Sequence, residues 1–266
     1  MKNLKYYLNE AKRNKYAIGQ FNFSTLTQLR GILSAVNKLE TPVILGVSEG
    51  ELNYLGLEEV VALVEIAKAR SLAPLFLHLD HGKDVELIKR CVDYGFSSVH
   101  FDGSTLPLEK NTEYAKTIVQ YAHKKGVLVE GEMESIGLKS LASSEDIEKF
   151  GKETGIDSIA VAVGSVHGIA KVKLDFNKLK DLGSLIKDKF IVLHGGSGID
   201  KGQIRKAINL GVVKVNINTE IRIAWKEGMK KALKKNELKP YKIVPIVENI
   251  IQKKVAEKIK LFGTKK

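Results

Sequence analysis

The sequence contains a single cysteine, Cys91, among its 266 residues. One thiol cannot form an intrachain disulfide or supply a cysteine cluster, so any metal must bind to histidine, aspartate or glutamate. Prolines are also few, and no stretch rich in proline, glycine or serine divides the chain. The sequence therefore predicts one domain that covers residues 1–266.

Long hydrophobic runs are absent as well. No stretch approaches the roughly 18 consecutive apolar residues that a membrane-spanning helix needs. Residues 1–20 carry charges throughout and lack the apolar core of a signal peptide. We therefore expect a soluble, cytoplasmic protein with no membrane partner.

The net charge of +12 raises the question of a nucleic-acid partner. The lysines are scattered along predicted helices and become denser at 230–242 and 252–260, without a basic stripe interleaved with aromatic residues. We read them as solvated helix faces and expect no nucleic acid. The excess of positive charge favours anionic, phosphorylated substrates instead.

Short apolar runs rich in Val, Ile, Leu and Phe alternate along the chain with longer segments of helical period, which is typical of parallel strands joined by helices. The expected strands are 17–21, 42–47, 74–79, 97–101, 127–132, 158–163, 190–195 and 212–217. Eight such units predict a closed (β/α)₈ TIM barrel, because an open doubly wound sheet has fewer strands and a glycine-rich fingerprint that "GQFNFST" lacks. A last helix at about 244–261 must pack on the barrel or on a partner subunit.

Unusual polar residues gather where these strands end, which is the end at which barrel enzymes hold their active sites. They are Asp80, His81, Asp102, Glu132, His167, His194 and Asn216. Residues that lie far apart in the sequence are therefore expected to meet at one mouth.

Three of the histidines, His81, His167 and His194, are each followed directly by glycine. Three imidazoles leave the fourth position of a zinc ion open, as in catalytic zinc sites. The residues alone leave metal binding and ordinary hydrogen-bonded histidines as open alternatives. His78, His100 and His123 lack the following glycine, and we interpret them as structural.

The segments "HGGSG" at 194–198 and "NINTE" at 216–220 follow the seventh and eighth strands. Loops at these two positions often hold a phosphate, because free backbone N–H groups and a helix N-terminus favour an anion. We therefore predict a phosphate site beside the histidines.

The blocks "YAIGQFNF", "PVILGVSEGE", "LHLDHGKD", "FDGSTLP", "VEGEME", "DSIAVAVGSVHG", "FIVLHGGSGI", "GVVKVNINTEIRIAW" and "KIKLFGT" span nearly the whole chain. In this order they closely resemble the class II, metal-dependent ketose-bisphosphate aldolases, which include fructose-bisphosphate and tagatose-bisphosphate aldolases. The resemblance implies a carbon–carbon lyase of carbohydrate metabolism. Substrate and products would be a phosphorylated ketose, dihydroxyacetone phosphate and glyceraldehyde 3-phosphate.

The resemblance also implies roles for individual residues. His81, His167 and His194 would bind the catalytic zinc, and Asp102 and Glu132 would hold the metal in an alternative position. Asp80 would exchange a proton with the C4 oxygen, and Asn216 would donate to the enediolate oxygen. The implied substrate-binding positions are Ser48, Gly168, Gly195, Gly196, Ser197, Asn216, Ile217, Asn218 and Thr219. A monovalent cation (Na⁺ or K⁺) and a homodimer or homotetramer are implied only by the resemblance.

The chain departs from the family pattern after the fifth strand. Relatives have a loop with a doubled glycine before the acid that exchanges a proton with dihydroxyacetone phosphate, whereas residues 132–150 have no doubled glycine. That base stays unassigned, with Glu134, Glu145 and Asp146 as weak candidates. The segment after His167 is also short, and His100 stands where relatives usually have an apolar residue.

Fructose 1,6-bisphosphate is the first substrate we expect, with tagatose 1,6-bisphosphate or another ketose phosphate as alternatives. Two other readings are a barrel metallohydrolase and a homologue that binds zinc and triose phosphate without catalysis. A Schiff-base aldolase is not expected, because no predicted strand brings a lysine to the mouth, although Lys214 must be checked.

Overall fold

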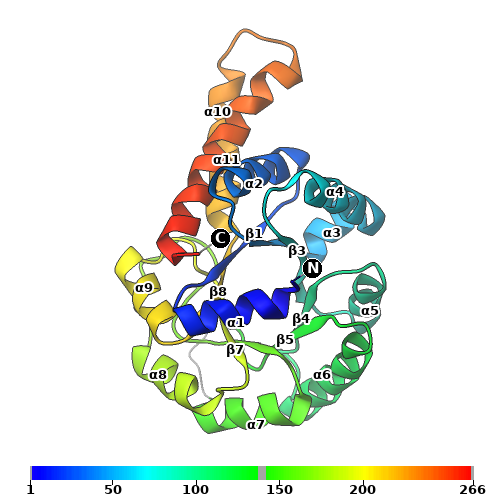
Figure 1. The fold of residues 1–266 in the computed structure, drawn as a ribbon, viewed down its shortest axis with the longest axis vertical. Coiled ribbons are helices and arrows are strands. Elements are labelled where there is room, and N and C mark those ends of the chain that lie inside the picture. The colour runs from blue at the N-terminus through cyan, green and yellow to red at the C-terminus, as the bar shows by residue number, and fades with distance from the viewer. Residues whose placement is uncertain (1, 137–141, 265–266) are drawn as a thin grey trace.

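The computed structural model describes residues 2–136 and 142–264. Eight parallel strands, hydrogen-bonded in chain order, close into a barrel in which the last strand pairs with the first (Figure 1). They are β1 (Ile18–Asn22), β2 (Val43–Ser48), β3 (Leu75–Gly82), β4 (Ser98–Asp102), β5 (Leu128–Glu132), β6 (Ser158–Ala160), β7 (Phe190–Leu193) and β8 (Val212–Ile217). The predicted (β/α)₈ barrel is confirmed, and each predicted strand is present.

Helices surround the barrel (Figure 1). They are α1 (Leu4–Asn14), α2 (Leu26–Leu39), α3 (Glu49–Leu55), α4 (Leu57–Arg70), α5 (Val85–Asp93), α6 (Leu108–His123), α7 (Ser144–Thr154), α8 (Phe176–Leu185), α9 (Lys201–Asn209), α10 (Thr219–Leu233) and α11 (Pro240–Phe262). Local signals set their ends: the Thr25 side chain accepts the Gln28 amide at the start of α2, and left-handed Glu40 ends it. None of the helices in the described ranges is long and apolar enough to cross a membrane.

Helix α1 lies across the N-terminal end of the barrel (Figure 1). Its buried Leu4, Leu8 and Ala11 form one apolar cluster with residues from several strands, including Phe76 and Phe190. This cluster fills the N-terminal end of the barrel interior. The C-terminal ends of the strands therefore form the open mouth.

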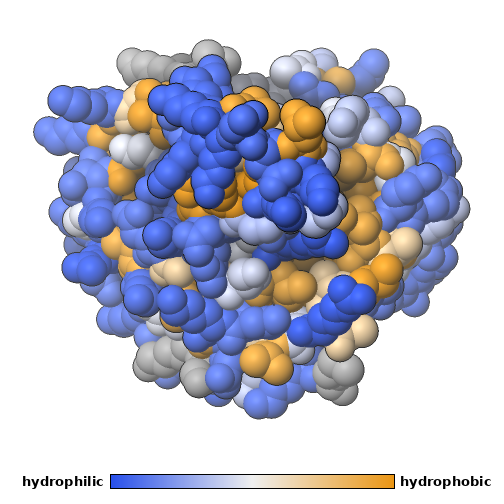
Figure 2. Space-filling view, turned by 90° about the horizontal axis from the view of Figure 1, so that it is seen from above, coloured by the Kyte–Doolittle hydropathy of each residue, from blue (hydrophilic) through white to orange (hydrophobic). Residues whose placement is uncertain are grey.

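The predicted last helix is present as α11, which packs against α2 and α10. Glycines permit this close packing, because a Cβ atom at Gly31 would lie 2.7 Å from Cβ of Ile251 and one at Gly228 would lie 2.9 Å from Cγ1 of Val247. Helices α10 and α11 extend beyond the barrel as a two-helix arm (Figure 1). The face in Figure 2 is largely hydrophilic with scattered apolar groups, and the lysines from 230 to 239 are exposed.

Four strands differ in length from the prediction. β5 begins at Leu128 rather than 127, and β7 ends at Leu193 rather than 195. β6 ends at Ala160 rather than 163: the Val161 amide still donates to the Val192 carbonyl of β7, but the Val163 carbonyl accepts the amide of Asp175 instead. β3 continues to Gly82 with a register shift between Leu79 and Gly82. That irregularity contains His81.

Candidate active site

The mouth of the barrel contains a cavity of about 200 Å³. Its lining consists of Ser48, Asp80, His81, His167, Gly168, His194, Gly195, Ser197, Asn216, Asn218, Thr219 and Arg222. Most of the predicted site residues therefore meet in one place. Gly196 and Ile217 do not line the cavity: the Gly196 amide donates to the Asn216 carbonyl, and Ile217 is fully buried.

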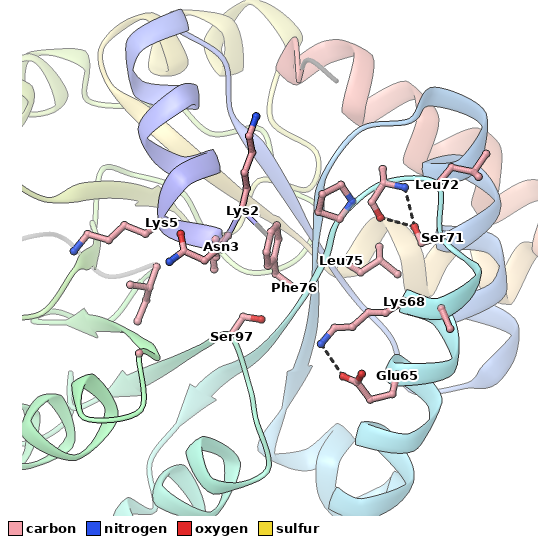
Figure 3. Close-up of a pocket in the computed structure, with 16 residues that line it drawn as sticks. Lys2, Asn3, Lys5, Glu65, Lys68, Ser71, Leu72, Leu75, Phe76 and Ser97 are labelled. Carbon is pink, nitrogen blue, oxygen red and sulfur yellow. Dashed lines mark hydrogen bonds and ion pairs between the residues drawn. The ribbon is translucent and has the colours of Figure 1, made fainter.

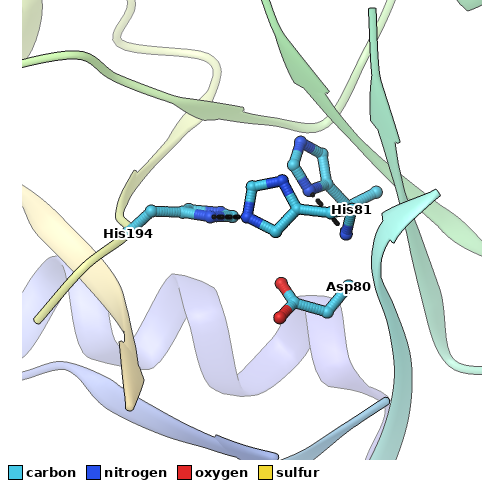
Figure 4. Close-up of side chains that lie close together, drawn as sticks. Asp80, His81 and His194 are labelled. Carbon is cyan, nitrogen blue, oxygen red and sulfur yellow. Dashed lines mark hydrogen bonds between the residues drawn. The ribbon is translucent and has the colours of Figure 1, made fainter. Parts of the chain in front are cut away.

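The three histidines predicted to bind metal are neighbours. Nδ1 of His194 lies 3.0 Å from Nε2 of His81, as Figure 4 shows. The ring centroid of His81 lies 5.0 Å from that of His167, which is exposed in the loop after β6. His81 thus stands between one buried imidazole and one at the surface.

The outer nitrogens of two of these rings face carboxylates. Nδ1 of His81 lies 2.9 Å from Oδ2 of Asp102, and Nε2 of His194 lies 2.7 Å from Oε1 of Glu130. A carboxylate accepts hydrogen bonds, so these outer nitrogens carry protons. The inner nitrogens, 3.0 Å apart, share one proton when His81 is protonated, and with both rings neutral they present two lone pairs that a metal ion can join. In metal sites of known proteins, carboxylates that orient a metal-binding histidine accept a hydrogen bond from its outer nitrogen in the same way.

The electrostatics of the site also favour a cation. Burial opposes a charge on His81, but its hydrogen bond to Asp102 and the nearby Asp80 and Glu132 raise its pKa to about 9. Burial and the neighbouring Asp102 raise the pKa of Glu132 to about 8. Oε2 of Glu132 lies 3.8 Å from Nδ1 of His81, behind the ring. The donors and the negative field fit a divalent metal, and ligand atoms of His81, Asp102 and Glu132 lie within 4.8 Å of one another.

His81 has an unusual backbone. Its φ is +54°, a left-handed conformation that a residue with a side chain rarely adopts outside helix ends. Its amide donates a hydrogen bond of 3.1 Å to Nδ1 of His100, which is fully buried on β4. This contact gives His100, which the sequence left without an explanation, a place in the site.

Asp80 lies beside the histidines at the end of β3 (Figure 4). Its carboxylate accepts hydrogen bonds from Nδ2 of Asn22 at 2.9 Å and Nδ2 of Asn216 at 3.1 Å. Although burial opposes ionisation, the positive charge of His81 and His194 holds the pKa of Asp80 well below its usual range. Asp80 is therefore a carboxylate that can accept a proton.

Lys214 lies in the barrel interior below the mouth. Its Nζ donates to Oε2 of Glu130 at 2.7 Å and lies 3.2 Å from Nε2 of His78. Nδ1 of His78 in turn lies 2.7 Å from Oγ of Ser98. These contacts agree with the prediction that His78 is structural. Lys214 forms an ion pair with Glu130 and does not line the site cavity.

Glu130 and Arg222 belong to the site but were not predicted from the sequence. The spacing of Glu130 and Glu132 on β5 was the available signal, because residues two apart share one face of a strand. Arg222 lies four residues after Asn218 and so on the same face of the helix start. It resembled an ordinary exposed charge in the sequence.

The candidate loop acids do not line the site cavity. Glu134 accepts the Ala142 amide at 2.7 Å and pairs with Lys178 at 3.5 Å. Glu145 and Asp146 lie in the first turn of α7. Part of the stretch in which the base was sought, 137–141, lies outside the described residues.

A larger cavity, of about 770 Å³, lies near α1 at the opposite end of the barrel (Figure 3). Two of its three lysines form ion pairs: Lys5 pairs with Asp157 at 3.4 Å and Lys68 with Glu65 at 2.8 Å. None of the predicted site residues lines it. The chemistry therefore belongs to the smaller cavity at the mouth.

Comparison with known proteins agrees with this geometry. The family model described as "Fructose-bisphosphate aldolase class-II" matches residues 2–266. The fructose-bisphosphate aldolase of Geobacillus stearothermophilus is 40% identical over 280 aligned positions, covering 98% of this chain and 96% of that protein. The 6-phospho-5-dehydro-2-deoxy-D-gluconate aldolase of Shouchella clausii is 39% identical, covering 96% and 92%.

Among solved structures, the YdjI aldolase of Escherichia coli K12 superimposes with a TM-score of 0.89 at 29% identity, covering 99% of this chain and 97% of that one. The family model matches the chain over residues 2–266, and a curated relative is 40% identical to it. Both findings assign the chain to the same family. The chain belongs to the class II fructose-bisphosphate aldolase family, whose members are aldehyde-lyases.

Proposed function

We propose that this chain is a zinc-dependent aldolase that reversibly cleaves fructose 1,6-bisphosphate to dihydroxyacetone phosphate and glyceraldehyde 3-phosphate. The observation that carries the proposal is the single cavity lined by a carboxylate, three imidazoles and the residues of the predicted phosphate site. The names of the curated relatives support an aldol cleavage.

A zinc ion held by His81, His167 and His194 would supply Lewis-acid stabilisation of the negative charge that develops on the ketose oxygens. Asp80 would accept the proton of the C4 hydroxyl as the C3–C4 bond breaks, and would return it during condensation. Asn216 would donate a hydrogen bond from Nδ2 to the oxygen that becomes negative. Its buried Oδ1 has no hydrogen-bond partner among the described residues, so this oxygen is available to a substrate hydroxyl.

The phosphate of dihydroxyacetone phosphate would lie against Gly168, Gly195 and Ser197 and the start of α10. Asn218 and Thr219 lie at that helix start, where free N–H groups favour an anion. Gly195 has a φ of +63°, and a Cβ atom there would collide with the Val166 carbonyl oxygen. The loop therefore requires glycine at this position. A monovalent cation beside this loop is part of the same proposal.

We also propose that the chain is one domain that assembles into a homodimer or homotetramer in the cytoplasm. Its predicted substrates support that location, because ionised sugar phosphates do not cross membranes unaided. The exposed Leu233, Leu238 and Tyr241 on the arm support assembly as apolar contact points.

The direct test is a coupled assay of triose phosphate release on zinc-loaded protein, with and without EDTA. Fructose 1,6-bisphosphate, tagatose 1,6-bisphosphate and 6-phospho-5-dehydro-2-deoxygluconate are compared in parallel. We expect cleavage of fructose 1,6-bisphosphate that EDTA abolishes and that Asp80→Asn lowers by a factor of about 100 or more. Preferred cleavage of another compound would change the assigned substrate, and zinc binding without any cleavage would favour the binding homologue.

A further inference from the structure

We propose that Lys258, near the end of the C-terminal helix α11, is a positioning residue for the phosphate of dihydroxyacetone phosphate. It acts through Glu220, which fixes the loop at 194–198 in the form that binds this phosphate. This role rests on the proposed function, because it takes that loop to be a phosphate site. It goes beyond that function by giving a part in substrate binding to α11, none of whose residues lines the site cavity.

Reciprocal hydrogen bonds join this loop to the start of α10. The Glu220 amide donates to Oγ of Ser197 at 3.2 Å, and the Gly198 amide donates to Oε1 of Glu220 at 2.8 Å. On the other side of Ser197, the Gly196 amide donates to the Asn216 carbonyl at 3.1 Å. The backbone is therefore fixed on both sides of Ser197, which itself lines the site cavity.

Lys258 holds the Glu220 carboxylate in this place. Nζ of Lys258 donates to Oε1 of Glu220 at 2.5 Å, and Nζ of Lys254 lies 3.6 Å from Oε2. The Lys258 side chain is only 6% exposed, against 11% for Glu220 and 33% for Lys254. Lysine is almost never fully buried unless its charge is paired. The ion pair with Glu220 therefore explains why Lys258 lies inside the protein.

The ion pair does not face the substrate. Gly195 and Ser197 line the site cavity, whereas Gly198, Glu220 and Lys258 line a different hollow, of about 610 Å³. Helix α11 reaches this hollow because its packing partners include α9 and β1 as well as α2 and α10 (Figure 1). Lys258 can therefore act on a bound phosphate only through Glu220 and the loop.

Two effects of Lys258 favour a bound phosphate. Its ammonium group balances the negative charge of Glu220, which would otherwise repel an anion at the neighbouring loop. It also keeps the carboxylate at the Gly198 amide, so that the loop is ordered before the phosphate arrives and binding does not bear that cost. Both effects change the affinity for the half of the substrate that carries this phosphate. Neither changes the groups that break the carbon–carbon bond.

The condensation reaction tests this role, because its two substrates occupy different ends of the site. The KM for dihydroxyacetone phosphate and for glyceraldehyde 3-phosphate is measured on the zinc-loaded wild type, on Lys258→Met and on the control Lys260→Met, which removes an exposed lysine from the same helix. We expect Lys258→Met to raise the KM for dihydroxyacetone phosphate about tenfold. The KM for the aldehyde and kcat should stay near the wild-type values, and the control should match the wild type.

A double variant distinguishes the charge pair from the packing of α11. Adding Glu220→Gln to Lys258→Met removes the unpaired charge and keeps an acceptor for the Gly198 amide, so part of the lost affinity should return. No recovery, or an equal rise in both KM values, would show that Lys258 only supports the packing of α11. If Lys258→Met alone does not fold, the double variant is compared with the wild type, and a rise confined to the KM for dihydroxyacetone phosphate is expected.

Calorimetry of dihydroxyacetone phosphate binding gives a readout that needs no catalysis. If the wild type does not condense the two substrates, the proposed function fails, but weaker binding by Lys258→Met than by the wild type and Lys260→Met still supports the role of Lys258. Equal binding by the wild type and Lys258→Met, or no binding by either, overturns it.

Discussion

The backbone amide of His81 donates a hydrogen bond to Nδ1 of His100, which lies on the neighbouring strand. Because Nδ1 accepts this bond, the imidazole proton lies on Nε2, which points at Oε2 of Glu132 from 3.5 Å. Both of these facing atoms are buried, and neither has a hydrogen-bond partner among the described residues. One imidazole thus lies between the left-handed backbone of His81 and a carboxylate of the proposed metal site.

His100→Leu should weaken zinc binding about 10- to 100-fold, which is the usual effect of losing a group that orients a ligand. The change removes the acceptor of the His81 amide while keeping an apolar side chain of similar bulk. Competition with a chromophoric chelator measures the zinc affinity. His123→Gln is the control, because His123 bonds to Asp157 on the outside of the barrel. Unchanged zinc affinity in His100→Leu would show that His81 holds its conformation without help.

The second prediction concerns the stability of the fold and rests on the buried ion pair between Glu130 and Lys214. Both side chains are at most 3% exposed, and their charges lie 2.7 Å apart. Lys214→Met should destabilise the protein by about 3–5 kcal/mol, because it leaves the Glu130 carboxylate buried without its cation.

The double variant Lys214→Met with Glu130→Gln should recover part of that loss, since no uncompensated charge is left. Urea unfolding of the wild type, both single variants and the double variant measures the coupling. Purely additive effects of the two changes would contradict the pairing.

The sequence predicted the barrel and its mouth because both depend on short-range patterns. Apolar strands alternate with amphipathic helices, and the C-terminal ends of parallel strands must meet at one end of the barrel. Asp80, His81 and His194 could therefore be placed together from the order of the strands alone. The family resemblance then supplied their expected roles.

Contacts between distant residues could not be predicted in this way. Arg222 acquires its place from Glu51, which lies 171 residues earlier in the chain. The left-handed backbone of His81 depends on an acceptor from another strand, and the early end of β6 depends on Asp175. Each of these features follows from tertiary geometry, which composition and periodicity do not encode.

Acid should destabilise the metal-free protein in part through His78. Burial and the nearby Lys214 lower the pKa of His78 to about 3, whereas an unfolded histidine titrates near 6.5. Between these values the unfolded chain binds a proton that the folded chain does not. His78 therefore contributes full stability above about pH 6.5 and loses about 1.4 kcal/mol per pH unit below it.

His78→Gln should remove this part of the pH dependence, because glutamine does not titrate. Unfolding free energies in urea with EDTA, measured at several values between about pH 7.5 and 4.5, give the two slopes. In the variant, the slope of the unfolding free energy against pH should be smaller by the equivalent of about one bound proton. Parallel curves for variant and wild type would mean that His78 titrates alike in both states.

The reactivity of the Cys91 thiol should measure how often α5, which carries this residue, opens away from the barrel. It is fully buried on α5, and burial raises the pKa of its thiol to about 12. At pH 8 only about one thiol in ten thousand is ionised, and reagents cannot reach it. The native protein should therefore resist a chromogenic disulfide reagent, whereas the protein unfolded in guanidinium should release one equivalent.

Zinc should slow this labelling further. Helix α5 packs against β3 and β4, which hold Asp80, His81 and Asp102. A metal that binds only the folded state lowers the population of opened molecules in proportion to its saturation. The labelling rate is measured with added zinc and with EDTA, and the His100→Leu variant should show a smaller difference between them. Rapid labelling of the native protein that is insensitive to zinc would show that α5 opens independently of the site.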